Sequence, residues 1–228
     1  MMSGTPSEKG LKVNLGCGLV AHDGWVNVDG SLNAWLANHP FVATALSPLV
    51  GRGWKKWPKG IVRANLEKKL PFEDASVSLL YTSHFVEHLT KAEAKSVVDE
   101  IFRILKPSAV VRIVVPDLEG AARSYVASLD ANDDSAADTF LKRLYICRTT
   151  RPSPFRMRDW FSIWNDYQTH FWMYDARSMA RLLREAGFIN TGVKPCQVSS
   201  EIEDIVHVER KGSVGENGAG FAVEATRP

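Results

Sequence analysis

Residues 13–31 read VNLGCGLVAHDGWVNVDGS, and this stretch decides the fold. An apolar run leads into Gly16-Cys17-Gly18, and a second apolar run ends in Asp29. Glycines that follow a strand let the backbone approach a ligand closely, and a carboxylate after the next strand can accept hydrogen bonds from both hydroxyls of a ribose. The stretch therefore predicts two neighbouring strands whose ends form a nucleoside site. The alternatives are a plain tight turn at the glycines and an Asx-turn at Asp29.

The segment between the two apolar runs is too short for the helix that normally joins parallel strands. With Ala21, the two glycines satisfy the dinucleotide pattern G-x-G-x-x-G/A. That pattern also needs a helix to begin at once, facing a pyrophosphate, and an acid about 20 residues further on. Asp23-Gly24 is a turn pair, and Asp29 arrives too early. The missing helix therefore disfavours a cofactor with a pyrophosphate group. A ligand with a nucleoside but no phosphates remains compatible with the glycine turn and Asp29.

The composition is that of an ordinary globular chain. Its 228 residues suggest one domain, and 45% of them are hydrophobic. A formal net charge of +2 does not by itself indicate a nucleic-acid partner. The three cysteines are far apart, so neither a disulfide framework nor a cysteine zinc site is indicated. No apolar run approaches the roughly 18 residues that cross a bilayer, and the polar start predicts a disordered leader at 1–10 in a cytoplasmic protein.

The apolar runs predict strands that alternate with helices, which favours an α/β fold with a mostly parallel sheet and helices on both faces. Helical spacing of apolar residues predicts a helix from the N-cap Thr90 to about Leu105, and Ser31 is placed to cap a short helix. Residues 39–60 read as irregular because prolines and glycines interrupt them. The expected strands are 11–15, 25–28, 61–64, 77–82, 109–115, 188–193 and 221–225, and a further helix is expected at 176–186.

Several stretches, in this order, resemble the class I S-adenosylmethionine-dependent methyltransferases. They are VNLGCG, VNVDGS, RANLEKKLPFEDASVSLLYTSHFVEHL, EIFRILKPSAVVRIVVPDLE and MYDARSMARLLREAGF. The resemblance covers most of residues 11–118 and 173–193, and it is nearest to the small-molecule type with a SHxxEH segment after the fourth strand. It implies a Rossmann-like, mostly parallel seven-stranded sheet with an antiparallel last strand, and S-adenosyl-L-methionine as the cofactor.

The resemblance also implies a role for individual residues. The turn Gly16-Cys17-Gly18 is expected to lie against the cofactor, and Asp29 to hold its ribose. Asn65 and Leu66 stand where the family contacts the adenine, and Ser83 and His84 border the methionine portion and the acceptor. Asn14 stands where many members carry an acid, and it is included in the cofactor site.

The segment His84-Phe85-Val86-Glu87-His88 also spells HxxEH, an inverted zinc-peptidase motif. That interpretation needs both histidines on one helical face, whereas His84 follows the strand by two residues and the helical pattern begins only at Thr90. No metal is expected, and hydrogen bonding within the turn explains His88 more simply. His84 is the first candidate for a catalytic base, because a neutral imidazole can take a proton from a hydroxyl or an amine.

Residues 119–172 form an insertion that is expected to cover the acceptor as a lid within one domain, 11–228. Its aromatic residues can stack on a sugar or a planar group, and its arginines can bind an anion. Alternatively, the aromatics form the core of the lid and the cations a solvated face. His170 is a second candidate for catalysis. The residues in question are Lys142, Arg143, Arg148, Arg151, Arg156 and Arg158, followed by Trp160, Phe161, Trp164, Tyr167, Phe171 and Trp172.

The sequence therefore predicts an enzyme that transfers a methyl group from S-adenosyl-L-methionine to an oxygen or nitrogen atom of a small molecule, with a sugar or an anionic metabolite as the expected class. Neither a nucleic-acid nor a membrane partner is expected, and no pattern indicates the oligomeric state. The alternatives are a non-catalytic nucleoside-binding module of the same fold, and a zinc hydrolase that uses His84, Glu87 and His88.

Overall fold

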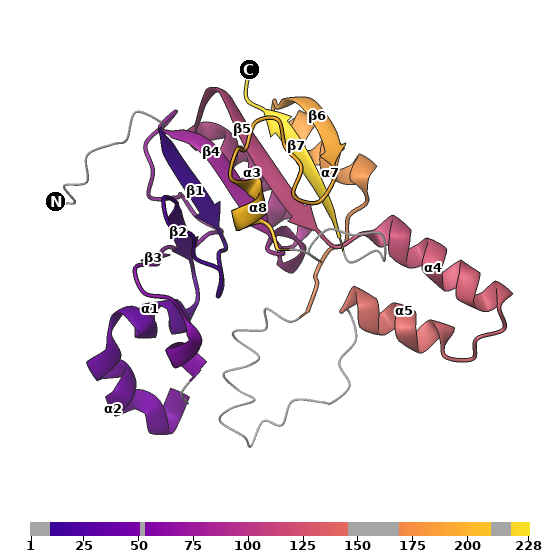
Figure 1. Ribbon diagram of the computed structural model, residues 1–228, viewed down its shortest axis with the longest axis horizontal. Coiled ribbons are helices and arrows are strands. Elements are labelled where there is room, and N and C mark those ends of the chain that lie inside the picture. Colours follow the sequence, from indigo (N-terminus) through magenta and orange to yellow (C-terminus); the bar gives the residue numbers. More distant parts are fainter. Residues whose placement is uncertain (1–9, 51–52, 146–168, 211–219) are drawn as a thin grey trace.

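The computed structural model describes residues 10–50, 53–145, 169–210 and 220–228, and they form one seven-stranded sheet with helices around it (Figure 1). The strand order is β3-β2-β1-β4-β5-β7-β6. The first five strands are parallel, and β7 runs antiparallel to both β5 and β6. The strands are β1 Leu11–Leu15, β2 Val26–Asp29, β3 Val62–Arg63, β4 Val77–Ser83, β5 Leu105–Val115, β6 Ile189–Lys194 and β7 Phe221–Thr226.

Helices follow β2, β4, β5 and β6, whereas β1 leads to β2 and β3 leads to β4 without a helix. The α-helices are α1 Leu32–Asn38, α2 Pro40–Val50, α3 Lys91–Ile104, α4 Leu118–Asp130, α5 Ala136–Leu144, α7 Ala176–Glu185 and α8 Ile205–Val208. Two short 3-10 helices, η1 Gly53–Lys56 and η2 Val86–His88, complete the described elements. Among the described residues, no helix combines the length and the apolar character that crossing a membrane requires. The predicted α/β sheet, with its antiparallel last strand, is confirmed.

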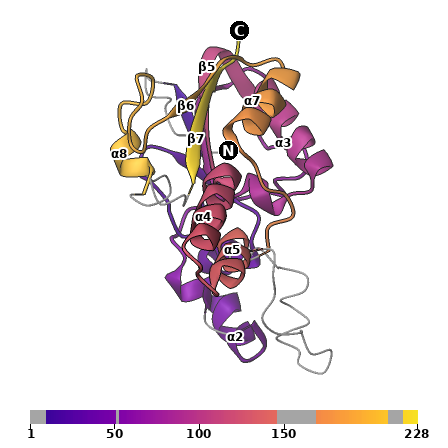
Figure 2. The same cartoon turned by 90° about the vertical axis from the view of Figure 1, so that its right-hand side faces the viewer.

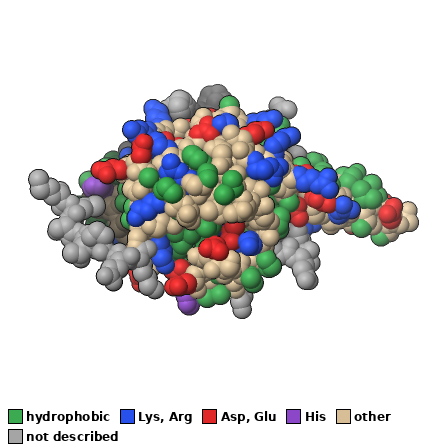
Figure 3. Space-filling view, turned by 90° about the horizontal axis from the view of Figure 1, so that it is seen from above, with side chains coloured by type: hydrophobic (Ala, Val, Ile, Leu, Met, Phe, Trp, Pro, Cys, Tyr) green, Lys and Arg blue, Asp and Glu red, His purple; other side chains and the backbone are tan. Residues whose placement is uncertain are grey.

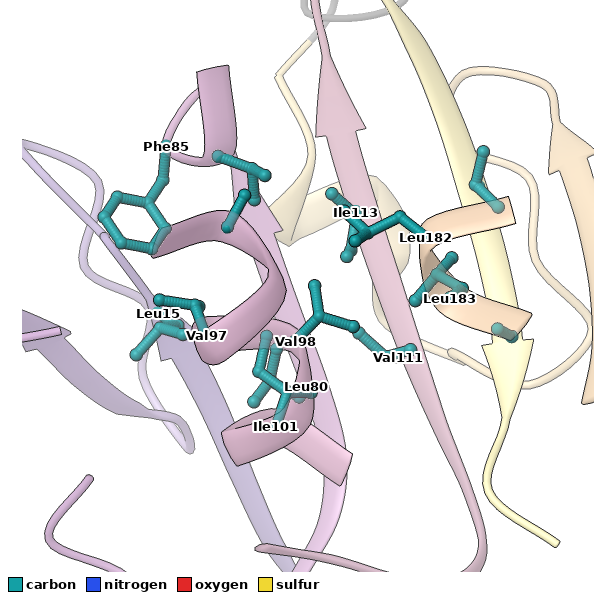
Figure 4. Packing of buried hydrophobic residues seen from close by; sticks show 14 of the residues in the cluster. Leu15, Leu80, Phe85, Val97, Val98, Ile101, Val111, Ile113, Leu182 and Leu183 are labelled. Atoms are coloured by element: carbon teal, nitrogen blue, oxygen red, sulfur yellow. The ribbon is translucent and has the colours of Figure 1, made fainter. Parts of the chain in front are cut away.

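One face of the sheet packs against α3 and α7 (Figure 2). Both helices begin with a capping box, made by Thr90 with Glu93 in α3 and by Asp175 with Ser178 in α7. Their apolar sides meet alternate residues of β1, β4 and β5 (Figure 4). The labelled core residues there are Leu15, Leu80, Phe85, Val97, Val98, Ile101, Val111, Ile113, Leu182 and Leu183.

The strands β1 and β2 are joined without a helix, as the sequence predicts, and the register explains how. Val13 pairs with Val26 and Leu15 with Val28. After β1 ends at Leu15, the connection therefore returns along the sheet by only about 7 Å, the length of two strand residues, and β2 begins beside Val13. Two buried or half-buried amides brace this connection. The Asn14 side chain donates to the carbonyl of Val20 and to Oδ1 of Asn27, while Asn27 donates to the carbonyls of His22 and Trp25.

The opposite face of the sheet is covered by residues 195–209, which lie between β6 and β7. Ile202, Ile205 and Val208 from this segment pack with Trp25 in a second apolar cluster. The Trp25 indole N–H donates to Asp204, which also forms an ion pair with Lys12. Figure 2 shows α8 across the sheet from α3 and α7. Residues 195–209 therefore cover the face of the sheet that a helix between β1 and β2 would help to cover in a regular α/β fold.

Arg112, in the middle of β5, holds this late segment in place. Its side chain is fully buried, and all five of its N–H groups donate hydrogen bonds. Glu209 accepts two of them at 2.9 and 2.7 Å, and Glu224, directly opposite on β7, accepts one at 2.9 Å. The carbonyls of Pro195 and Val198 accept the other two. Burial alone would lower the pKa of Arg112, but the two glutamates raise it, so the guanidinium stays charged.

One region differs from the sequence prediction, and the expected insertion contains helices that were not predicted. Residues 39–60 were expected to be irregular, but they contain α2 and η1. Pro40 is the first residue of α2, where its missing N–H would have no partner in any case. The expected insertion contains α4 and α5, which lie against each other, and residues 146–168 of it lie outside the described residues, as does nearly all of the expected leader. Figure 3 shows hydrophobic side chains over the projecting α4, where Val126 and Leu129 are exposed.

We predict that Arg112→Met lowers the free energy of unfolding by about 3–5 kcal/mol, because the buried Glu209 loses the cation it is bonded to and Glu224 keeps only Lys194, at 3.8 Å. Arg123→Met is the matched control, since its ion pair with Glu119 on α4 is largely exposed and is worth about 0–1 kcal/mol. Urea denaturation of both variants measures the difference. Equal losses in the two variants would contradict the role of Arg112.

Candidate functional site

The glycine turn after β1 lies at the edge of the sheet where the parallel strands end. Gly16 and Gly18 both have positive φ, +67° and +53°. A Cβ on Gly16 would lie 2.9 Å from Cβ of Phe85, so this glycine is needed for close packing against the turn after β4. A Cβ on Gly18 would meet nothing within 4 Å. Gly18 therefore borders open space, as a backbone that approaches a ligand does.

Asp29 ends β2, and its buried carboxylate faces the same turn. Oδ2 accepts from the Gly18 amide at 2.9 Å, and Oδ1 accepts from the Ser31 amide at 2.8 Å. The second bond is the Asx-turn that the sequence offered as an alternative. An ionised carboxylate has about four acceptor positions, so each oxygen keeps capacity for a ligand hydroxyl. The structure thus brings the glycine turn and Asp29 together.

Cys17, between the two glycines, is a buried thiol. It packs with Ala34 and Ile61, and burial together with the charge of Asp29 raises its pKa to about 12. A thiol with such a pKa stays protonated near neutral pH, and the thiolate is the nucleophilic form. The side chain of Cys17 is therefore a packing group, and any contact it makes with a ligand is through its backbone.

Asn65 and Leu66 follow β3 on the same edge of the sheet. The Asn65 side chain is exposed and accepts from the Glu67 amide at 3.0 Å, which makes a local turn. The Leu66 side chain is buried in the main core. Asn14, which the sequence also places in the cofactor site, uses both hydrogens of its amide inside the β1–β2 connection.

His84 and Glu87 form a pair at the end of β4. His84 follows Ser83, has a left-handed backbone with φ of +52°, and donates its amide to the carbonyl of Val114. Its Nδ1 lies 3.1 Å from Oε1 of Glu87, whose side chain is fully buried, whereas the His84 side chain is 38% exposed. A buried carboxylate therefore sets the orientation of a half-exposed imidazole, an arrangement that suits a proton acceptor.

Glu87 also lies against a segment that is distant in sequence. Its backbone carbonyl accepts from the amides of Phe171 and Trp172, at 2.9 and 3.2 Å. The rings of His88 and His170 meet edge to face, with centroids 5.1 Å apart. Burial lowers the pKa of His170, which keeps its imidazole neutral near pH 7. The structure thus places His170 beside the turn after β4, which carries His84. These two histidines are the sequence candidates for catalysis.

The zinc-hydrolase interpretation requires His84 and His88 to bind one ion from the same helical face. The two side chains instead belong to different hydrogen-bonded pairs. Val86–His88 is a single 3-10 turn, not a regular helix face. His84 bonds to Glu87, and His88 instead bonds through Nδ1 to the carbonyl of Thr169. Among the described residues, the group with ligand atoms close together is Glu87, His88 and His170.

The basic and aromatic residues of the expected lid are only partly described. Lys142 and Arg143 lie in the last turn of α5, and Phe171 and Trp172 are 60% and 44% exposed beside η2. Sequence reasoning missed the part played by Tyr174, whose buried hydroxyl lies near Glu87 and whose pKa is raised to about 12 by burial and by that carboxylate. The lid residues that lie outside the described residues are Arg148, Arg151, Arg156, Arg158, Trp160, Phe161, Trp164 and Tyr167.

Comparisons with known proteins agree with this geometry. Residues 14–113 match the family model described as a methyltransferase domain. No curated protein matches the chain. The fold is similar to that of a S-adenosylmethionine-dependent methyltransferase from Thermotoga maritima, described as a possible histamine N-methyltransferase, with 16% identity, a TM-score of 0.50, and coverage of 97% of this chain and 84% of that one. It is also similar to a possible exported protein from Bordetella parapertussis, with 14% identity, a TM-score of 0.51, and coverage of 98% and 63%.

We predict that Cys17 resists alkylation by iodoacetamide at pH 8 in the folded protein, because its thiol is buried and its pKa is raised to about 12. The half-buried Cys196 is the internal comparison and should react first. Mass spectrometry of the labelled peptides, with and without urea, measures both. Labelling of Cys17 as fast as Cys196 without urea would contradict the assignment.

Proposed function

We propose that the chain is a class I S-adenosylmethionine-dependent methyltransferase and that it methylates an oxygen or nitrogen atom of a small-molecule acceptor. The fold and the methyltransferase-domain match over residues 14–113 support this proposal. The observation that carries the proposal is the pair formed by His84 and the buried Glu87 at the end of β4. Phe85, between them, packs on Gly16, so the pair lies beside the glycine turn.

S-Adenosylmethionine supplies an activated methyl group when it is bound. In our proposal Gly16, Cys17 and Gly18 approach it through their backbone, and Asp29 holds the ribose hydroxyls with the acceptor capacity left on its two oxygens. Asn65 and the backbone of Leu66 border the adenine, and Ser83 borders the methionine portion. Asn14 acts through the β1–β2 connection that it braces.

His84 is proposed to take the proton that a hydroxyl or amine acceptor must lose. Glu87 orients the ring through Nδ1 at 3.1 Å, so the side chain is held before the acceptor arrives. Alignment of the acceptor and exclusion of water account for the rest of the catalysis. The exposed ring of Phe171, whose amide is bonded to the Glu87 carbonyl, offers a face on which a sugar can stack.

The insertion between β5 and α7 is proposed to cover the acceptor. Helix α4 begins at Leu118, directly after the end of β5, and the Leu118 amide donates to the carbonyl of Tyr174. The two ends of the insertion are therefore held together at the edge of the sheet that carries Asp29 and His84. Figure 1 shows the pair α4–α5 projecting from this edge.

We predict that Gly18→Ala weakens binding of S-adenosylmethionine at least about tenfold, because the added methyl group enters the space that the backbone leaves for the cofactor. Gly24→Ala is the matched control. Gly24 has φ of +79° and also has no neighbour within 4 Å, so both variants carry the same backbone strain of about 1–2 kcal/mol. Calorimetric titration measures the affinity, and thermal unfolding measures the strain. Equal affinities of the two variants would exclude the glycine turn from the site.

We predict that His84→Ala lowers kcat about 100-fold or more and leaves the affinity for S-adenosylmethionine unchanged, because only proton removal from the acceptor is lost. The assay follows the demethylated cofactor product over a panel of sugars, sugar acids and small amines. His207→Ala, an exposed histidine on α8, is the control. Wild-type turnover in His84→Ala on the acceptor found would refute the base role and leave methyl transfer itself standing.

A further inference from the structure

We propose that Glu87, His88 and His170 form a binding site for a divalent transition-metal ion of the zinc type. One ligand atom from each of the three residues lies within 4.8 Å of the others. Two histidines and a carboxylate are a common ligand set for such ions, and three protein ligands leave one position open. The proposal concerns binding alone and does not depend on the methyl acceptor.

The backbone brings the three residues together before any ion binds. Glu87 and His88 belong to η2, and His170 lies about 80 residues later in the chain. The Glu87 carbonyl accepts from the amides of Phe171 and Trp172, which join the two segments on either side of the cluster. The ligand positions are thus set by main-chain hydrogen bonds and not by the chance placement of long surface side chains.

The hydrogen bonds of Glu87 and His88 prepare them for ligation. His88 bonds through Nδ1 to the Thr169 carbonyl at 3.2 Å, and a bond of this kind makes Nδ1 the protonated nitrogen and leaves Nε2 with its lone pair. Glu87 bonds through Oε1 to His84, which fixes the carboxylate plane. Second contacts of this type orient metal ligands in proteins generally.

Three buried polar atoms, two in the cluster and one beside it, have no hydrogen-bond partner among the residues that the structure describes. They are Oε2 of Glu87, Nδ1 of His170 and the hydroxyl of Tyr174. The Glu87 side chain is fully buried, so a carboxylate oxygen without a partner there carries a desolvation cost that no hydrogen bond within 10–50, 53–145, 169–210 and 220–228 offsets. A cation bonded to Oε2 and to the imidazoles removes that cost. Both the types of the side chains and their unpartnered atoms therefore favour a bound cation at this site.

The spacing requires a small adjustment on binding. Ligand atoms around a tetrahedral zinc ion lie about 3.4 Å apart, given bonds of about 2.0–2.2 Å. The cluster, at up to 4.8 Å, would therefore close by up to about 1.4 Å through side-chain rotation when the ion binds. This arrangement differs from the HxxEH hydrolase interpretation, because His170 replaces His84 as the second histidine and Glu87 is a ligand.

The test is metal binding by the full-length chain after treatment with a chelator. Calorimetric titration with Zn²⁺ should give one site per chain, and Co²⁺ should give the visible absorption of a tetrahedral nitrogen and oxygen site without a thiolate charge-transfer band. Glu87→Gln and His170→Ala should each lower the Zn²⁺ affinity about 100-fold or more. His207→Ala, on α8, should bind as the wild type does.

The same variants are titrated with S-adenosylmethionine, so that a variant that fails to fold is distinguished from one that has lost only the metal. Retained cofactor binding with lost Zn²⁺ binding supports the site. Weak binding at several places per chain, or full affinity in both Glu87→Gln and His170→Ala, overturns it. A thiolate band with Co²⁺ would also overturn it, because the ion would then be held by cysteine.

Discussion

Cover on the second face of the sheet depends on the hydrogen bonds of the buried Arg112 guanidinium. A sheet of this kind needs apolar cover on both faces, and the connection from β1 to β2 contributes no helix to that cover. Residues 195–209 take its place, and four hydrogen bonds from Arg112, to Glu209 and to the carbonyls of Pro195 and Val198, hold them there. The fifth goes to Glu224 on β7. Since a buried charge is tolerated only when it is fully paired, the late segment and the strand that carries Arg112 require each other.

The proposed cofactor site depends on the short connection between β1 and β2. The β1–β2 connection can be short because β2 begins opposite Val13, and its Asn14–Asn27 brace keeps the glycine turn compact. Gly16 then packs directly on Phe85, which brings the turn after β1 against the turn after β4. The proposed nucleoside site and the proposed base therefore lie side by side because Gly16 has no side chain.

Glu87 links the proposed chemistry to the insertion. Its carboxylate orients His84, and its backbone carbonyl binds the chain that returns from the insertion at Phe171 and Trp172. One oxygen of this fully buried carboxylate has no partner in the described part of the chain, and a further positive or donor group would stabilise it. The proposed ion would satisfy it with His88 and His170, and it would tie the returning chain to the end of β4.

The sequence alone determined the strands, the capped helix after Thr90, the absence of a helix after Gly18 and the class of cofactor, because these depend on local periodicity, turn residues and motif spacing. It could not show that Arg112 is the centre of a buried ion cluster, since its partners lie 86–112 residues away for Val198, Glu209 and Glu224. Nor could it join His170 to Glu87 and His88, or find α2, α4 and α5. Only the tertiary structure decides such contacts, because desolvation and long-range pairing act on residues that packing, and not sequence spacing, brings together.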